Sequence, residues 1–214
     1  MSGPSLAEEI VLLSLDDATG RPLGRAGMAP DLALAGALLM DLALAGRIDT
    51  DRDRVLLVDS TPTGDAVADA ALRHLATPGA PSDARGLLPL LAREAGTARE
   101  ALLARLVAAG VLKRVEERVL FVFADRRFPK APGRSEASDA RARLRATLLE
   151  REIPEPRDAL LLGLARAAGL LPVILSAEEL SGVQPWLAVV TRIESLNRSL
   201  GTAVADVRAM RVGG

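Results

Sequence analysis

Apolar residues recur every three or four positions along most of the chain, and loops rich in proline and glycine separate these segments. This spacing places apolar side chains on one face of an α-helix. The clearest example is the helix expected after Pro62. The ring of Pro62 fixes φ in the turn that precedes this helix. Thr63 is expected to be the N-cap of that helix, and Gly64 and Asp65 to form its first turn, where a carboxylate suits the helix dipole. The pattern predicts a mainly α-helical protein.

Capping residues mark other helix boundaries. Ser5 and Glu8 have the spacing of a capping box, which predicts a helix start at Ser5. Asp31 is expected to cap a long helix that ends at Ala45, before Gly46; it is apolar almost all round, so we expect it to be buried. Loops are expected at residues 20–30, 77–89, 129–138 and 154–156. None is long enough to be an independent linker, so the chain is predicted to form a single domain.

Two segments, offset by 64 residues, resemble each other. Residues 43–58 and 107–122 each read as a helix end, a glycine, a short strand, a charged turn and a second strand, and Glu116 and Glu117 are expected at the second turn. A helix followed by a two-stranded wing is the outline of a winged-helix module, so a tandem nucleic-acid-binding protein is one functional alternative. A glycine-capped helix that packs on a hairpin is also a common local structure, and both interpretations stay open.

Composition narrows the class of protein. Hydrophobic residues make up 49% of the chain and aromatic residues only 2%, so the core is expected to consist of Leu, Ala and Val, a mixture that favours helices. The absence of cysteine excludes disulfides and thiolate metal sites and is consistent with a cytoplasmic protein. No signal peptide or membrane span is expected, so any membrane contact would be peripheral. The Ala, Arg, Gly and Leu bias is typical of a GC-rich bacterial genome.

Charge is unevenly distributed although the net charge is only −1. Residues 113–151 hold 11 Lys and Arg against 6 Asp and Glu, whereas the remainder holds 16 against 22. A locally basic face is one interpretation, and scattered solvated charges are the other. The densest basic run lies around Phe128 and contains Arg126, Arg127, Lys130 and Arg134. A basic loop with an aromatic residue suits anionic headgroups or a nucleic-acid backbone.

Catalytic and metal-binding patterns are scarce. His74 is the only histidine, and its own helix offers no carboxylate three or four residues before it to orient the ring. Alternating aspartates at residues 49–53 suggest a calcium loop, but Arg54 and Ser60 stand where such a loop needs Gly and Glu. The sequence also has no phosphate-loop or nucleophile-elbow motif. We therefore expect a non-enzymatic protein with no cofactor and no metal.

Three motifs together resemble a known family. They are LAEEIVLLSLDDATG at residues 6–20, GALLMDLALAGRI at residues 36–48 and STPTGDAVADAALRHL at residues 60–75. In this order and spacing they resemble the Golgi phosphoprotein 3 family, over about residues 5–200, which leaves residues 201–214 as a C-terminal segment. The resemblance implies a mainly α, single helical domain with small β-hairpins. Eukaryotic members recognise phosphatidylinositol 4-phosphate, which implies a peripheral adaptor that binds anionic membrane lipid.

The resemblance also implies where a lipid headgroup would bind. The family site has a Trp and an Arg before and in the long second helix, and two Arg residues three positions apart on the helix that leads to the second hairpin. The corresponding positions here are Arg25 or Ala26 for the Trp, and Ala35, Gly96 and Arg99 for the three Arg residues. Arg99 is thus retained, and Arg21 and Arg25 can supply substitute charge from the loop. The expected headgroup residues are Arg99, Arg25 and Arg21.

The hairpin at residues 111–123 is implicated in assembly. In the family this hairpin contributes to oligomer contacts, and here the strand expected from Val119 to Phe123 is apolar on both faces. Because Glu116 and Glu117 would resist an anionic bilayer, we expect this strand to lie at a subunit contact of a homo-oligomer or in the core. Nucleic acid is disfavoured as a partner because residues 36–45 offer only Asp41 as a polar side chain, although residues 99–109 offer Arg99 and Arg105 and leave the question open for the second unit. The expected location is the cytoplasm, peripheral at the inner membrane face.

Overall fold

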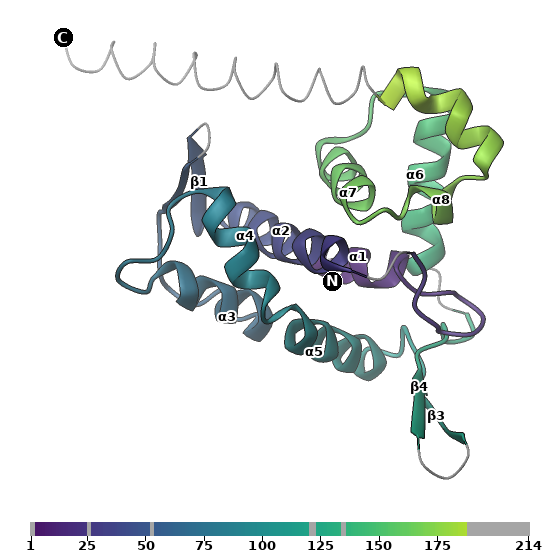
Figure 1. Cartoon of the computed structure of the whole chain (residues 1–214), viewed down its shortest axis with the longest axis horizontal. Coiled ribbons are helices and arrows are strands. Elements are labelled where there is room, and N and C mark those ends of the chain that lie inside the picture. Colours follow the sequence, from purple (N-terminus) through teal and green to yellow (C-terminus); the bar gives the residue numbers. More distant parts are fainter. Residues whose placement is uncertain (1–2, 25–26, 52–53, 120–122, 134–135, 188–214) are drawn as a thin grey trace.

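The computed structural model describes residues 3–24, 27–51, 54–119, 123–133 and 136–187 (Figure 1). Within this part of the chain the structure is mainly helical, with two small antiparallel sheets of two strands each, which confirms the predicted fold class. The helices are α1 Leu6–Leu13, α2 Met28–Leu44, α3 Ala66–Leu75, α4 Ala84–Ala92, α5 Ala95–Ala108, α6 Glu136–Glu150, α7 Pro156–Ala167 and α8 Leu171–Ile174, and residues 177–187 are also helical.

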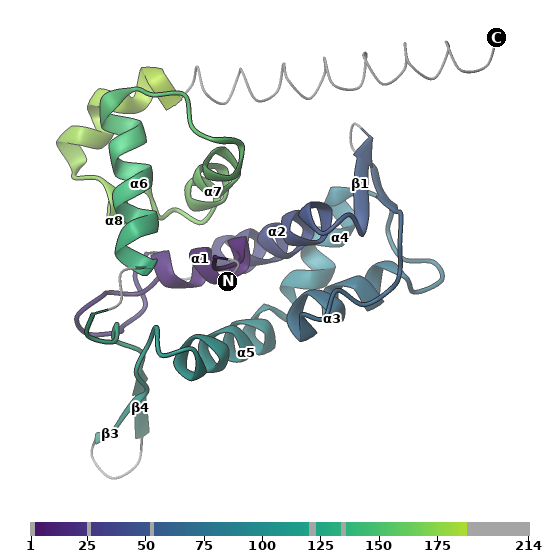
Figure 2. The same ribbon diagram turned by 180° about the vertical axis from the view of Figure 1, so that it is seen from behind.

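Helix α2 lies at the centre of the fold and contacts α1, α3, α4, α5 and α7. Figures 1 and 2 show α3 and α5 on one side of the α1–α2 pair and α6, α7 and α8 on the other, while α4 crosses α2. The buried side of α2 consists only of Ala and Leu, as the composition predicts. Its central position confirms that α2 is a buried helix. Among the described residues, none of the helices combines the length and the hydropathy of a membrane span.

Helix α2 begins earlier than predicted. Its first residue is Met28 and its N-cap is Gly27, so Asp31 lies inside the first turns and is not the cap. The Asp31 carboxylate is instead directed to a residue of another helix, described below. The predicted end is confirmed to within one residue, because Ala45 is the C-cap and Gly46 follows with φ of 68°.

The start of α3 differs from the prediction for a local steric reason. Gly64 has φ of 87°, which is not a helical conformation, so the helix cannot extend back to Thr63. Thr63 is therefore not the N-cap, and its hydroxyl donates to Asp69 at 2.7 Å. Asp65 is the N-cap, and its Oδ1 accepts hydrogen bonds from the backbone N–H groups of Val67 and Ala68 at 2.9 and 3.3 Å. The carboxylate thus satisfies two donors that a helix start leaves open.

The predicted capping box at the first helix is confirmed. Glu8 N donates to Ser5 Oγ at 3.2 Å, and Ser5 N donates to Glu8 Oε2 at 2.8 Å. The predicted loop at residues 77–89 is wrong in its second half, because Asp83 caps α4, which contains Pro89. A single proline marks a loop less reliably than a capping side chain does, since tertiary packing can hold a helix that carries one.

Both predicted hairpins are present, and the second differs in register. Strand β1 (Ile48–Asp51) pairs with β2 (Arg54–Leu57), and β3 (Val115–Val119) pairs with β4 (Phe123–Arg127). The hairpins lie at opposite ends of the molecule (Figure 1). Glu116 and Glu117 belong to β3, opposite Arg126 and Asp125, and not to the turn.

The single strand predicted from Val119 to Phe123 is also wrong. Val119 and Phe123 face each other as register partners on the two strands of the hairpin. Residues 120–122 between them, including Phe121, lie outside the described part of the chain. Val119 and Phe123 thus belong to two antiparallel strands, and the prediction failed because no Gly or Pro separates them in the sequence.

Candidate functional site

A cavity of about 510 Å³ opens between the loop that follows α1, the start of α2, and helix α5. We call it the Arg99 cavity. Its charged side chains are Asp31, Arg99 and Arg126, and its walls are otherwise mostly apolar side chains and glycines. A concave, mostly apolar site of this volume with a few convergent polar groups is typical of a small-ligand site.

Hydrogen bonds within the loop after α1 hold one wall of the cavity. The backbone N–H and the hydroxyl of Thr19 both donate to Asp16 Oδ1, at 2.7 Å each. These bonds hold the pKa of Asp16 below its ordinary value, and the bond from the Thr19 hydroxyl contributes most. From α6, Arg141 donates to the carbonyl of Leu15 at 3.1 Å and pairs with Asp17 at 3.2 Å. The loop is therefore fixed both internally and by a distant helix.

Gly20 packs this loop against the segment that follows β4. Phe128 N donates to the Gly20 carbonyl at 3.1 Å, and Lys130 N donates to the Asp17 carbonyl at 3.0 Å. Gly20 has φ of 67°, and a Cβ atom there would lie 2.1 Å from Pro129 N. Only glycine fits such a position without a backbone shift. This contact places Phe128 in the wall of the Arg99 cavity.

Within the cavity, a cation and an anion form a direct pair. Arg99 Nη2 donates to Asp31 Oδ1 at 2.6 Å, with 34% and 37% of the two side chains exposed. Arg126 has a 53% exposed side chain and lies 3.7 Å from Glu116 and 3.9 Å from Glu100, longer than a hydrogen bond. The cavity lining thus carries two guanidinium groups and one carboxylate.

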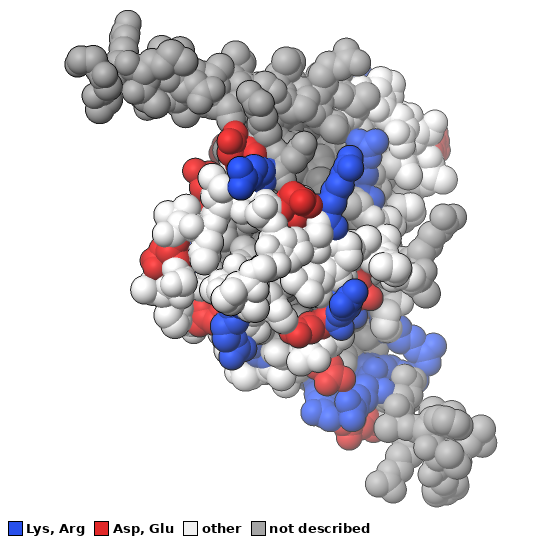
Figure 3. Space-filling model, turned by 60° about the vertical axis from the view of Figure 1, so that its left-hand side comes forward, with Lys and Arg blue, Asp and Glu red and all other residues white. Residues whose placement is uncertain are grey.

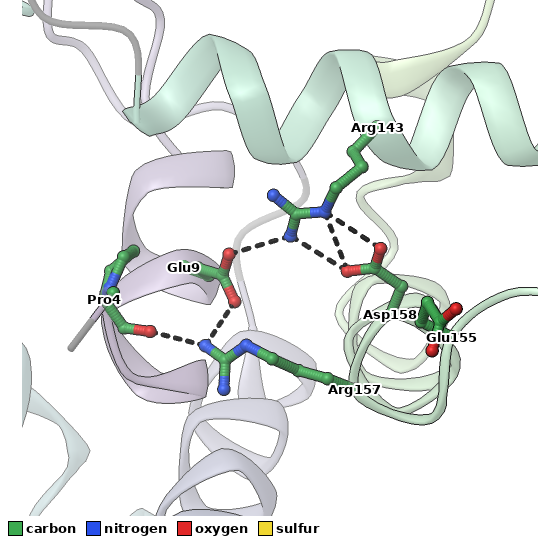
Figure 4. A pocket seen from close by; sticks show the side chains of 7 residues that line it. Pro4, Glu9, Arg143, Glu155, Arg157 and Asp158 are labelled. Atoms are coloured by element: carbon green, nitrogen blue, oxygen red, sulfur yellow. Dashed lines mark hydrogen bonds and ion pairs between the residues drawn. The ribbon is translucent and has the colours of Figure 1, made fainter.

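A second cavity, of about 460 Å³, lies between α1, α6 and α7 (Figure 4). Glu9 is 3% exposed and accepts hydrogen bonds from Arg143 at 3.0 Å and from Arg157 at 2.7 Å. Arg143 also donates from Nε to both oxygens of Asp158 at 2.9 Å, and Arg157 donates to the Pro4 carbonyl. These mutual pairs join α1 to α6 and α7, so the cluster has a structural role.

The single histidine also has a partner from another segment. His74 Nε2 lies 3.0 Å from Glu94 Oε2, where Glu94 is the N-cap residue of α5. The carboxylate beside His74 therefore comes from Glu94, 20 residues later in the sequence, and not from its own helix. The pair connects α3 to the start of α5. No group of three or more His, Cys, Asp or Glu residues that could hold a metal occurs among the described residues.

Residues 6–210 match the sequence profile of the Golgi phosphoprotein 3 (GPP34) family. The chain belongs to the Golgi phosphoprotein 3 family. This confirms the resemblance drawn from the three motifs, and the family is one of non-catalytic, phosphoinositide-binding adaptors, as the expectation of a non-enzyme requires. No curated protein matches the chain.

The positions that correspond to the headgroup site of the Golgi phosphoprotein 3 family lie in different surroundings where the structure describes them. Arg99, the retained position, lines the Arg99 cavity. Ala35 is 1% exposed and lies in the core, and Gly96 has open space where a side chain would be. The position of the family Trp, at Arg25 or Ala26, lies outside the described part of the chain.

Of the two expected substitutes for the missing family residues, only Arg21 is described. It is an exposed residue between Gly20 and Pro22, both of which line the Arg99 cavity, whereas Arg25 lies outside the described residues. The backbone carbonyl of Arg21 accepts from Asp16 N at 2.9 Å, which fixes it in the ordered loop.

Two cavity residues were not among the expected site residues. Asp31 was expected to be a helix cap, and the sequence around it gives no sign of a contact with Arg99, which is 68 residues away along the chain. Arg126 did have a signal, since it belongs to the basic run around Phe128, and the fold brings both of these residues to the cavity. The site thus includes an acidic group beside Arg99.

Proposed function

We propose that this Golgi phosphoprotein 3 family member is a non-enzymatic peripheral adaptor that binds anionic lipid headgroups through the Arg99 cavity. The observation that supports it most directly is that the one retained family arginine, Arg99, lines a cavity of about 510 Å³. In this proposal Arg21, which lies between the cavity residues Gly20 and Pro22, attracts the headgroup together with Arg25. Phosphatidylinositol 4-phosphate is the phosphoinositide that the family implies.

Surface charge near the cavity supports contact with an anionic bilayer. Lys113, Arg114 and Arg126 are exposed at the base of the β3–β4 hairpin, and Glu116, which lies beside both arginines, offsets part of their charge. Figure 3 shows Lys and Arg side chains gathered at the lower end of the molecule, the end where this hairpin lies in Figure 1. Each cation near an anionic membrane contributes about 1 kcal/mol. Such a patch strengthens association without any inserted segment.

The proposal includes weaker recognition of phosphoinositides than the four family positions would give. Only Arg99 is retained, and Asp31 places negative charge beside it at 2.6 Å. A phosphomonoester that approaches Arg99 therefore meets repulsion from Asp31, which favours headgroups of lower negative charge.

Location and assembly remain predictions. We propose a cytoplasmic protein of bacterial source, peripheral at the inner membrane face, with a domain at residues 5–200 and a C-terminal segment at residues 201–214. The homo-oligomer contact through the hairpin at residues 111–123 is tested by light scattering of the wild type against a Phe121→Ser variant. A wild type that stays monomeric at high concentration would remove that part of the proposal.

The alternative, a tandem winged-helix-like nucleic-acid binder, loses support from the arrangement of its two reading helices. Helix α2 is enclosed by five other helices and cannot enter a DNA groove. On α5, Arg105 is held by both Glu8 and Asp65, so of the two arginines of this helix only Arg99 could contact a nucleic acid. Nucleic acid is therefore not part of the proposal.

Liposome co-sedimentation tests the proposed function. Vesicles of phosphatidylcholine alone are compared with vesicles that also contain phosphatidylglycerol or phosphatidylinositol 4-phosphate. We expect binding only to the anionic vesicles, a decrease with added salt, and a further decrease for Arg99→Ala. Arg85→Ala is the matched control, since it removes an exposed arginine of α4 outside the cavity. Equal binding to neutral and anionic vesicles would contradict the proposal.

A further inference from the structure

Asp31 is the feature of the Arg99 cavity that a purely anionic ligand does not explain. Its carboxylate lines the cavity and lies 2.6 Å from Arg99, the residue proposed to hold the headgroup. A ligand that carries only negative charge would have to compete with Asp31 for Arg99 and would leave Asp31 facing a second anion. A cation on the ligand removes that conflict.

Exchange of partners is then possible within the cavity. When a phosphate binds Arg99, the Asp31–Arg99 pair opens, and an ammonium group on the same ligand can replace the guanidinium as the partner of Asp31. Both protein charges stay paired during this exchange, which avoids the cost of an uncompensated charge in a partly covered site. A primary ammonium group has three donors and can bind a carboxylate in this way.

Arg126 supplies the third charge. Its ion pairs with Glu116 and Glu100 measure 3.7 and 3.9 Å and involve side chains that are at least half exposed, so they are weak. A guanidinium group can bind a carboxylate in a bidentate manner, with two parallel hydrogen bonds. The cavity lining therefore suits a ligand with two anionic groups and one cationic group.

We infer that the Arg99 cavity selects a phosphoserine-type headgroup, the headgroup of a lipid that joins a phosphate, an ammonium and a carboxylate. The phosphate pairs with Arg99, the ammonium with Asp31 and the carboxylate with Arg126. This inference rests on the proposed function and names the lipid class for the same site. Apolar side chains of the same cavity, Leu23, Leu103, Phe128 and Leu170, suit the glycerol end of a lipid better than a free phosphoamino acid.

The test compares two vesicle types of equal net charge. Phosphatidylcholine vesicles contain the same molar fraction of either phosphatidylserine or phosphatidylglycerol, and only the former carries the ammonium group. We expect the wild type to bind the phosphatidylserine vesicles about fivefold more tightly, the contribution of one partly exposed ion pair. Asp31→Asn should lose this preference while it still binds phosphatidylglycerol vesicles. Glu178→Gln, which removes an exposed carboxylate outside the cavity, should keep it.

Different failures have different meanings. Equal binding of the wild type to both anionic vesicles, above phosphatidylcholine alone, would overturn the inference and leave the proposed function intact. Binding to neither would overturn both. A preference that persists in Asp31→Asn would show that Asp31 does not recognise the ammonium group, and would also overturn the inference.

A competition experiment covers the case in which Asp31→Asn does not fold, as judged by circular dichroism. Soluble phosphoserine should release wild-type protein from phosphatidylserine vesicles, whereas glycerol 3-phosphate, which has the same net charge and no ammonium, should not. Equal release by both would contradict the inference. Tight binding of phosphoserine with no vesicle binding would identify a free phosphoamino acid as the ligand and contradict the lipid assignment.

Discussion

Arg99 of α5 donates a 2.6 Å hydrogen bond to Asp31 of α2, and this pair connects two helices within the candidate site. More than a third of each side chain is exposed, and exposed ion pairs contribute little to stability. We therefore expect Arg99→Ala to lower the free energy of unfolding by less than about 1 kcal/mol while it weakens binding to anionic vesicles. Leu103→Ala on the same helix, 8% exposed, should cost about 2–4 kcal/mol. Urea unfolding measures both, and an Arg99→Ala variant as unstable as Leu103→Ala would assign Arg99 a structural role.

Glu9 should be the most sensitive acidic residue of the chain among those described. It is 3% exposed and paired with Arg143 and Arg157, whose side chains are 41% and 39% exposed. Because water reaches both arginines, we expect Glu9→Ala to cost about 2–3 kcal/mol, less than the loss of a fully buried pair. Glu100→Ala, at a 78% exposed side chain, should change stability by less than about 0.5 kcal/mol. A similar loss in the two variants would contradict the structural role of the Glu9 cluster.

Two leucines of α2 test its placement in the core. Leu39 is 8% exposed and Leu44, at the end of the same helix, is 59% exposed. Leu39→Asp should cost at least about 4 kcal/mol because it buries an unpaired charge, whereas Leu44→Asp should cost less than about 1 kcal/mol. Thermal unfolding followed by circular dichroism gives both values. Near wild-type stability of Leu39→Asp would remove the assignment of α2 as the central helix.

Glycine at position 20 is required for the cavity wall, and Gly46 is its natural control. The two residues have φ of 67° and 68°, but a Cβ at Gly20 meets Pro129 and one at Gly46 meets nothing within 4 Å. Gly46→Ala should cost about 1 kcal/mol, the conformational penalty alone. Gly20→Ala should cost clearly more and weaken vesicle binding, since the loop must move away from Phe128. Equal effects of the two substitutions on stability would show that the contact is not close.

Acid stability should depend on Glu179. Hydrogen bonds from Arg145 lower the pKa of Glu179 from an ordinary 4.5 to about 2. A carboxyl group with a lowered pKa in the folded state contributes stability above its unfolded pKa, and that contribution disappears as the pH falls through the folded pKa. The difference in urea midpoint between wild type and Glu179→Gln should therefore decrease as the pH falls from 4.5 to about 2. The neighbouring exposed Glu178→Gln is the control, and a difference that stays constant over this range would contradict the pair.

Local signals in the sequence were sufficient where one short segment decides the structure. The capping box of Ser5 and Glu8 and the glycine stop at Gly46 require only neighbouring residues, and both are present. The start of α3 was missed because two capping candidates, Thr63 and Asp65, lie two residues apart. The backbone conformation of Gly64, which no local pattern states, decides between them.

The candidate site could be predicted only in part, because its charges come from three distant segments. Arg99 was located through the family resemblance. Its partner Asp31 lies 68 residues before it, and Arg126 lies on a hairpin strand whose register was wrongly predicted. Such contacts depend on how helices and hairpins pack together, and the order of residues along one segment does not report this.

The Glu9 cluster has a consequence for how the chain is made. Glu9 emerges from the ribosome 134 residues before Arg143 and 148 residues before Arg157. At ordinary rates of translation this interval is roughly 7–30 s, during which α1 can pack against α2 and α5 but its carboxylate has no arginine from α6 or α7. The nascent protein must therefore keep the Glu9 side of α1 hydrated until synthesis is nearly complete. Closure of that side by α6 and α7 would be a late step of folding, and ribosome-bound chains that stop before residue 143 would present it to chaperones.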